Sequence, residues 1–177
     1  IPFLKQDYSS YWTEEQEVNI LNALRYILTH KNCKVVGQNW MYDAQFLYRW
    51  WFITVPPARD TMLMQHTCFP SEEKSLAHIA SIYCQHYQYW KDEGKVRDDK
   101  LPMERRWVYN CKDSCYTLEG SNVLVEVTKA CGMEEQSKFQ HDLWSAVFVT
   151  TCRGLRRDEQ KRQGCAIELM EESIERR

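Results

Sequence analysis

VVGQNWMYDAQFL, residues 35–47, is the stretch that decides the fold class of this chain. A short β-branched run predicts a buried strand over residues 34–37, and apolar residues at helical spacing predict a helix from Asp43 to Trp51. A strand that passes directly into a helix is typical of an α/β layer. Because α/β proteins bind ligands at the carboxyl ends of their strands, we expect Asn39 and Asp43 at the edge of a sheet.

Asp43 itself has two interpretations. A single acid near the start of a helix commonly serves as an N-cap, or as a first-turn charge that complements the helix dipole. The same acid at a sheet edge is also placed to do chemistry. The stretch alone favours the capping role, so evidence for chemistry has to come from the rest of the chain.

The composition is that of a globular protein. The chain has 177 residues, of which 44% are hydrophobic and 27% charged, so its length suits one domain or one domain plus part of another. A net charge of -2 is not the basic character of a protein that holds duplex DNA through its phosphates. A nucleic-acid partner would therefore be held locally, with help from metal ions. No apolar run approaches membrane-spanning length, so no membrane partner is expected.

The eight cysteines contain no C-x-x-C pair. In a chain of this length without a secretory signal, they are expected to be reduced thiols in the core. A zinc site is an alternative, but the candidate ligands match no standard zinc spacing. These candidates are His66, Cys68, His78, Cys84 and His86.

The first part of the chain alternates predicted strands and helices. Residues 1–3 are expected to be an apolar strand entered midway, and a further strand is predicted near residues 53–55. Thr13 and Gln16 form a capping box that begins a helix over residues 13–28.

Two shorter helices follow, the first capped by Asp60 and the second beginning at Ser75. Residues 84–101 are predicted to be an irregular loop, whose segment WKDEGKVRDDK could lie near a substrate or be plain surface.

From Met103 onwards only helices are predicted. One runs to Cys131 and is ended by Gly132, and a second spans residues 134–152. Asp158 caps a last helix that continues to the C-terminus.

Tyr109 and Asp113 lie four residues apart in the first of these long helices, so they share one face of it. Taken alone, the pair is explained by a half-buried tyrosine beside a solvated acid. Asp113 is expected to lie off the centre of the apolar stripe of the helix. That stripe is predicted to be Val108, Cys111, Cys115 and Leu118.

Together, these segments resemble the proofreading 3′→5′ exonuclease domains of family A DNA polymerases, in the acidic-tetrad superfamily. VGQNWMYD resembles the family's second motif and YNCKD its third motif, Tyr-x-x-x-Asp, in the tyrosine subtype. RDTML and KSLAHIASIY resemble the joint and the helix between them, and YQYWKDEGK is most similar to phage-type members. The tail FQHDLWSAVFVTTCRGLRRDEQKR resembles the family's link into the polymerase part.

The resemblance implies an α/β, RNase H-like exonuclease fold, with a truncated mixed sheet and flanking helices, over residues 1–131. A helical linker toward a polymerase domain would occupy residues 132–177. The family's first motif, Asp-x-Glu on a strand, does not occur before Val35, and Glu15-Gln-Glu17 lies in a predicted helix instead. We therefore interpret the chain as a fragment that begins after the first motif; a divergent domain that has lost the motif is the alternative.

The resemblance also implies the chemistry of the site. In the family, four carboxylates bind two divalent ions, which for such hard ligands are Mg²⁺ or Mn²⁺. Asp43 would act on the second metal through water, Asp113 would bind the first metal directly, and Tyr109 would orient the attacking water. With two of the four carboxylates missing, we expect little or no exonuclease activity from this chain alone.

The implied partners are a single-stranded DNA 3′ end, or primer terminus, and a polymerase domain in the same parent chain. Gln38, Asn39 and Tyr42 would lie along the DNA strand, where Tyr42 could contact a base or a sugar. The expected location is the cytoplasm of a bacterial or phage-infected cell.

Two other functions compete with proofreading. An RNase D-like exoribonuclease shares Tyr-x-x-x-Asp, although the tail with Arg153, Gly154 and Asp158 argues against it. A non-catalytic nucleic-acid-binding or scaffolding module could retain the fold with a degenerate site.

Overall fold

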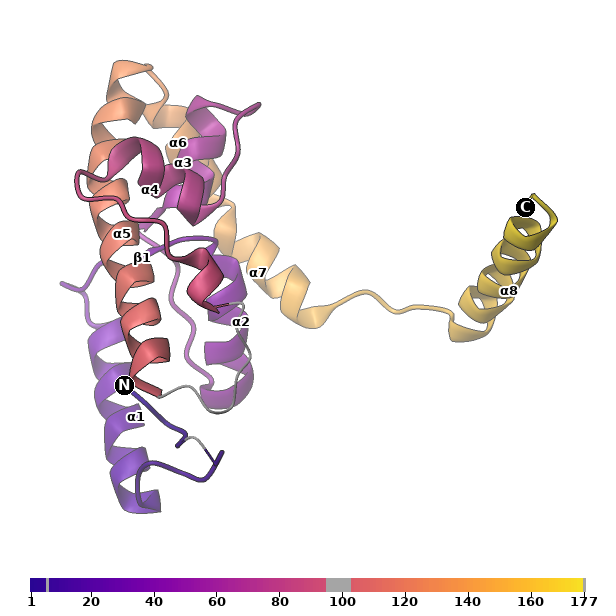
Figure 1. Cartoon of the computed structure of the whole chain (residues 1–177), viewed down its shortest axis with the longest axis horizontal. Coiled ribbons are helices and arrows are strands. Elements are labelled where there is room, and N and C mark those ends of the chain that lie inside the picture. The colour runs from indigo at the N-terminus through magenta and orange to yellow at the C-terminus, as the bar shows by residue number, and fades with distance from the viewer. Residues whose placement is uncertain (6, 95–102, 177) are drawn as a thin grey trace.

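The computed structural model of the protein describes residues 1–5, 7–94 and 103–176 (Figure 1). Two short strands lie among helices, and the long helix α5 runs along much of the main body (Figure 1). The elements are α1 (Glu14–Thr29), β1 (Val36–Gly37), α2 (Trp40–Trp51), β2 (Arg59–Asp60), α3 (Thr61–Cys68), α4 (Leu76–Tyr83), the 3₁₀ turn η1 (Lys91–Gly94), α5 (Met103–Ala130), α6 (Glu134–Asp142), α7 (Trp144–Arg153) and α8 (Glu159–Glu175).

The two strands pair in parallel, with Val36 opposite Arg59 and Gly37 opposite Asp60. Each strand passes directly into a helix, β1 into α2 and β2 into α3. The carboxyl ends of both strands, and the first turns of both helices, therefore meet at one edge of the small sheet. This confirms a mixed α/β layer over the first part of the chain.

Asp60 holds this edge together. Its side chain is 2% exposed and caps its own helix α3, accepting the N–H of Met62 on Oδ1 at 2.9 Å. The same carboxylate accepts the N–H of Asn39 on Oδ1 at 3.0 Å and the N–H of Trp40 on Oδ2 at 2.7 Å. Asn39, the N-cap residue of α2, makes no side-chain cap of its own, so Asp60 caps both helices.

The core is divided among three small groups of side chains. Beneath η1, the fully buried Trp90 packs with Leu76, Ala80 and Cys84. A second group joins α3, α4 and α5 through Met64, Ile79 and Leu124. The third joins α2 to α7 through Ala44, Trp144 and Phe148.

Several local predictions are confirmed. The capping box of Thr13 and Gln16 begins α1, and Ser75 and Asp158 cap α4 and α8 through their side-chain oxygens. Gly132, two residues beyond the end of α5, has a φ of 65°, a conformation that glycine adopts without steric cost.

Other local predictions are wrong. Residues 53–55 form no strand, and the second strand is Arg59–Asp60. The reason is that the carbonyl of Val35 accepts hydrogen bonds from the N–H groups of Ala58 and Arg59, which follow the two prolines. Residues 1–3 form no strand either, and Leu4 makes an isolated antiparallel bridge with Ser10.

Helix boundaries differ in two further places. The second helix begins at Trp40 rather than Asp43, because the cap supplied by Asp60 extends it by a turn. The predicted helix over residues 134–152 is divided at Leu143 into α6 and α7.

The expectation of core cysteines is mostly wrong. All eight thiols are free, but six are exposed, since they lie on outward faces of helices or in connecting segments. Cys84 is buried, and burial raises the pKa of its thiol to about 11.

The packed face of α5 also differs from the predicted stripe. Val108 and Leu118 are 51% and 53% exposed, and Cys111 and Cys115 are exposed as well. The helix instead packs through small and polar residues that let α3 and α4 approach closely; a Cβ on Gly120 would lie 3.2 Å from Ile79. The buried members of this face are Thr117, Gly120, Ser121, Leu124 and Thr128.

Helix α8 stands apart from the main body (Figure 1), and its described side chains are exposed. Among the described residues, no helix is long and apolar enough to cross a membrane.

We predict that Asp60→Ala lowers the free energy of unfolding by at least about 3 kcal/mol, because three partly buried N–H groups lose their acceptor. Urea unfolding followed by circular dichroism measures this loss. Asp158→Ala is the matched control, since it removes the cap of the exposed helix α8 and should leave the main transition unchanged. Equal midpoints for Asp60→Ala and the unmodified chain would contradict the double-cap interpretation.

Candidate functional site

A cavity of about 590 Å³ lies between the sheet edge and α5. Asp43 from the first turn of α2 and Asp113 from the middle of α5 both line it. Lys91 from η1 lies in the same wall, beside Gln38 and Trp40 from the junction between β1 and α2. The structure therefore brings the two predicted acids into one cavity, although they are far apart in the sequence.

Asp43 is not an N-cap; it lies within the first turn of α2. Its side chain is exposed to solvent at the cavity, yet partial desolvation raises the pKa of its carboxyl group, and repulsion from Asp60 and Asp113 adds to the rise. Desolvation also raises the pKa of the buried Asp60, against the lowering effect of its N–H donors. Asp43 thus feels the negative charges of both Asp60 and Asp113, and a bound cation would relieve this repulsion.

Asp113 lies on the packed side of α5 and makes two strong contacts through the same oxygen. Its Oδ1 accepts the indole N–H of Trp90 at 2.6 Å and pairs with the ammonium of Lys91 at 2.8 Å. The Lys91 Nζ also donates to the hydroxyl of Tyr109 at 3.3 Å. Tyr109 and Asp113 therefore point at one common cation, as their spacing of one helical turn allows.

The three residues predicted to contact nucleic acid have different surroundings. Gln38 is held within the fold, because its amide nitrogen donates to the carbonyl of Lys74 at 2.8 Å and its oxygen accepts from Thr61. Asn39 has an exposed side chain and a left-handed backbone, with a φ of 53°.

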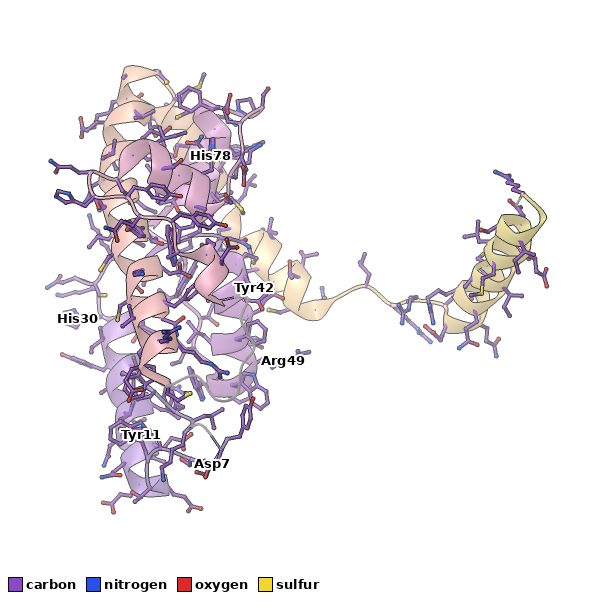
Figure 2. The ribbon with its side chains drawn as sticks, viewed as in Figure 1. Asp7, Tyr11, His30, Tyr42, Arg49 and His78 are labelled. Carbon is purple, nitrogen blue, oxygen red and sulfur yellow. The ribbon has the colours of Figure 1, made fainter. Side chains whose placement is uncertain are left out.

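Tyr42 is 60% exposed and lies on the same side of α2 as Arg49 (Figure 2). Its ring contacts Phe46, with the ring centroids 5.0 Å apart. It lines a separate cavity of about 350 Å³ between α2 and α7, rather than the cavity that holds the two acids.

Sequence reasoning missed the two neighbours of Asp113, Trp90 and Lys91. Both lie in the predicted irregular loop, where no periodic pattern indicates which side chains turn inward. Their only signal was the aromatic and basic pair inside YQYWKDEGK. Residues 95–101 of that predicted loop lie outside the described part of the chain.

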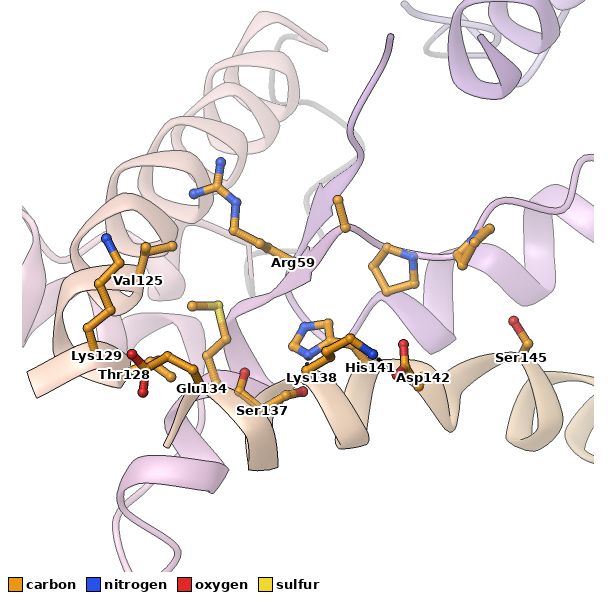
Figure 3. A pocket seen from close by; sticks show the side chains of 14 residues that line it. Arg59, Val125, Thr128, Lys129, Glu134, Ser137, Lys138, His141, Asp142 and Ser145 are labelled. Carbon is orange, nitrogen blue, oxygen red and sulfur yellow. Dashed lines mark hydrogen bonds and ion pairs between the residues drawn. The ribbon is translucent and has the colours of Figure 1, made fainter. Parts of the chain in front are cut away.

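A second cavity, of about 580 Å³, lies beside β2 and α6 (Figure 3). It contains none of the predicted site residues, and its charges are mixed: Arg59 lines it, and Lys138 pairs with Asp142. His141 closes it against the sheet: its Nε2 accepts the N–H of Asp60 at 2.9 Å, while its Nδ1 lies 2.7 Å from the carbonyl of Ser137. Both bonds are made by the tautomer protonated on Nδ1.

The acid-lined cavity offers the type of ligand that a hard divalent ion prefers, but its described residues offer too few such ligands. Asp43 and Asp113 offer carboxylate oxygens, which Mg²⁺ and Mn²⁺ prefer. Asp60 is occupied by three N–H donors, and within the described residues no three acidic, histidine or cysteine side chains converge to hold a metal ion. The described residues therefore fit part of a metal site.

Comparison with known proteins identifies the family of the chain. Residues 4–128, more than half of the chain, match the 3′-5′ exonuclease domain of family A DNA polymerases. The chain belongs to this exonuclease family.

A DNA polymerase I is similar to the chain over a slightly shorter stretch. The chain is 24% identical to DNA polymerase I of Borreliella burgdorferi over 119 residues, which cover 66% of the chain and 13% of that protein. The chain thus matches only a small part of this relative's length. No solved structure matches the chain.

We predict that Asp43→Asn raises the free energy of unfolding at pH 7, by less than about 1 kcal/mol because the side chain is exposed. A carboxyl whose pKa is raised above its ordinary 3.8 binds more protons in the folded than in the unfolded protein. Its contribution to stability therefore falls as pH rises through that interval. Urea unfolding at pH 7 and pH 3 should show the gain at pH 7 alone.

Asp7→Asn is the control of opposite sign. Hydrogen bonds from Ser9 lower the pKa of Asp7, so its ionised form stabilises the fold above the ordinary value of 3.8, and this variant should lose stability at pH 7. A loss of stability in Asp43→Asn at pH 7 would contradict the raised pKa of Asp43.

Proposed function

We propose that the chain is the proofreading 3′→5′ exonuclease portion of a DNA polymerase. Its reaction would be hydrolysis of the terminal phosphodiester of a single-stranded DNA 3′ end. The observation that carries this proposal is the meeting of Asp43 and Asp113 in one cavity of a chain that matches the exonuclease family over residues 4–128. The tyrosine subtype, the phage-like origin and the RNase H-like topology are parts of the same proposal.

The residues of the cavity divide the chemistry among them. Asp43 and Asp113 would hold the divalent ions, Mg²⁺ or Mn²⁺, that exonuclease domains of this type generally use. When bound, such ions supply an activated water and neutralise charge on the phosphate. The indole of Trp90 fixes the orientation of the Asp113 carboxylate, since it is fully buried and donates to Oδ1.

Tyr109 would orient the attacking water. Its hydroxyl oxygen accepts from Lys91, and a hydroxyl in that state can still donate its own proton to a water or a phosphate oxygen. Asn39 and Tyr42, with exposed side chains at the start of α2, would contact the DNA strand. Gln38 would act indirectly, because its side chain holds the backbone beside this contact in place.

The parent context is also proposed. The match to a DNA polymerase I suggests a polymerase domain in the same parent chain, with residues 1–131 forming the exonuclease part and residues 132–177 the helical link. The proposed location is the cytoplasm of a bacterial or phage-infected cell.

A non-catalytic nucleic-acid-binding or scaffolding module is the second candidate. One observation favours it: among the described residues, the acid-lined cavity holds two carboxylates free of backbone caps, and one of these is already paired with Lys91. Activity measurements on the chain and on its parent separate the two candidates.

We predict little or no nucleotide release by the 177-residue chain from 5′-labelled single-stranded DNA, with Mg²⁺ or Mn²⁺, because the described residues do not assemble the family's four carboxylates. Gel electrophoresis of the products measures the rate. A single-stranded RNA of the same sequence is the parallel substrate that tests the RNase D-like alternative. Metal-dependent shortening of either strand would overturn this prediction.

In the parent protein, we predict that Asp43→Ala or Asp113→Ala lowers 3′→5′ nucleotide release by about 10²- to 10⁴-fold, because ligands for the charge on the phosphate are lost. Asp142→Ala, an exposed acid beside the other cavity, is the matched control and should retain activity. Unchanged release in either cavity variant would remove the assignment of that acid.

A further inference from the structure

Lys91 occupies a cation site that this chain builds from its own residues. The ammonium pairs with Asp113 Oδ1 at 2.8 Å and donates to the hydroxyl of Tyr109 at 3.3 Å. It also lies over two aromatic faces, 4.8 Å from the ring centroid of Trp90 and 5.1 Å from that of Tyr109. One carboxylate, one hydroxyl and two rings therefore surround a single positive charge.

Neither partner of this ion pair is fully solvated. The side chains of Lys91 and Asp113 are 25% and 32% exposed, so their attraction is screened less than that of a surface pair. The pair lines the same cavity as Asp43, so the lysine neutralises one of the carboxylates that repel there.

The same carboxylate is the one proposed as a direct metal ligand. A divalent ion bound to Asp113 would meet the ammonium within a few ångströms, and the repulsion between the two cations would weaken its binding. Lys91 and a metal ion are therefore competitors for Asp113.

The competition can be resolved by motion of one side chain. Trp90 is fully buried among Leu76, Ala80 and Cys84, so the backbone before Lys91 is anchored. A lysine has a flexible four-carbon stem, and its ammonium can leave Asp113 while the indole N–H of Trp90 keeps the carboxylate in place.

We propose that Lys91 is a built-in counter-cation that sets the affinity of Asp113 for divalent ions, and that a metal ion binds there only when the lysine ammonium is displaced. The inference rests on the part of the proposed function that makes Asp113 a metal ligand. Lys91 thus neutralises the charge of Asp113 when metal is scarce.

The test is Mn²⁺ binding to the purified chain, measured by the loss of the electron paramagnetic resonance signal of the free aqueous ion. We expect Lys91→Met, which keeps the apolar stem over the two rings and removes the charge, to bind Mn²⁺ about tenfold tighter than the unmodified chain. Lys91→Arg retains a cation beside Asp113 and should bind as weakly as the unmodified chain.

Two further variants locate the effect. Lys34→Met removes a charge from a lysine that lines the same cavity, and it should leave the affinity within about threefold. Adding Asp113→Asn to Lys91→Met should abolish the gain, because the ligand is lost. Unfolding curves of each variant confirm that the comparison is made on folded protein.

The proposal is overturned by equal affinities in Lys91→Met and the unmodified chain, by an equal gain in Lys34→Met, by a gain that survives Asp113→Asn, or by the absence of Mn²⁺ binding in every variant.

Its failure is distinguishable from failure of the exonuclease proposal. Tighter Mn²⁺ binding in Lys91→Met, without nucleotide release by the parent protein, supports the lysine competitor and rejects the nuclease. Nucleotide release that depends on Asp113, with equal Mn²⁺ affinities in Lys91→Met and the unmodified chain, supports the nuclease and rejects the lysine competitor.

Discussion

The cap that Asp60 supplies to two helices is the constraint on which the rest of the site depends. A two-residue strand pair has little stability of its own, so the relative placement of α2 and α3 rests on the three N–H groups that share this one carboxylate. The arrangement has an electrostatic cost, because burial raises the pKa of Asp60 and its charge acts on Asp43. The acid that stabilises the fold, Asp60, therefore also affects the ionisation of Asp43 at the same sheet edge.

The local structure around this edge could be predicted where the signal was local. Thr13, Asp60 and Ser75 cap helices as predicted, because a capping side chain bonds to a backbone group only two or three residues away. The second cap made by Asp60 could not be predicted, since its donors lie about twenty residues earlier in the chain and meet it only through strand pairing.

The same distinction explains the site. The order of motifs was enough to identify Asp43 and Asp113 as candidates, and the structure places them in one cavity. The prediction that α5 packs through its apolar stripe was wrong, because the helix packs through small residues such as Gly120. Hydrophobicity alone does not reveal where two backbones approach closely. Lys91 could not be predicted at all, because only the tertiary fold brings an irregular turn against the middle of a long helix.

The hydrogen bond from Asp60 N–H to His141 has a consequence for what counts as the smallest self-standing piece of this protein. His141 lies in α6, beyond the residues that match the exonuclease family, yet it satisfies a backbone donor of the strand that carries the double cap. A chain cut after Cys131 would leave that buried donor without its acceptor. The structural unit that holds the double cap therefore extends into α6, as far as His141.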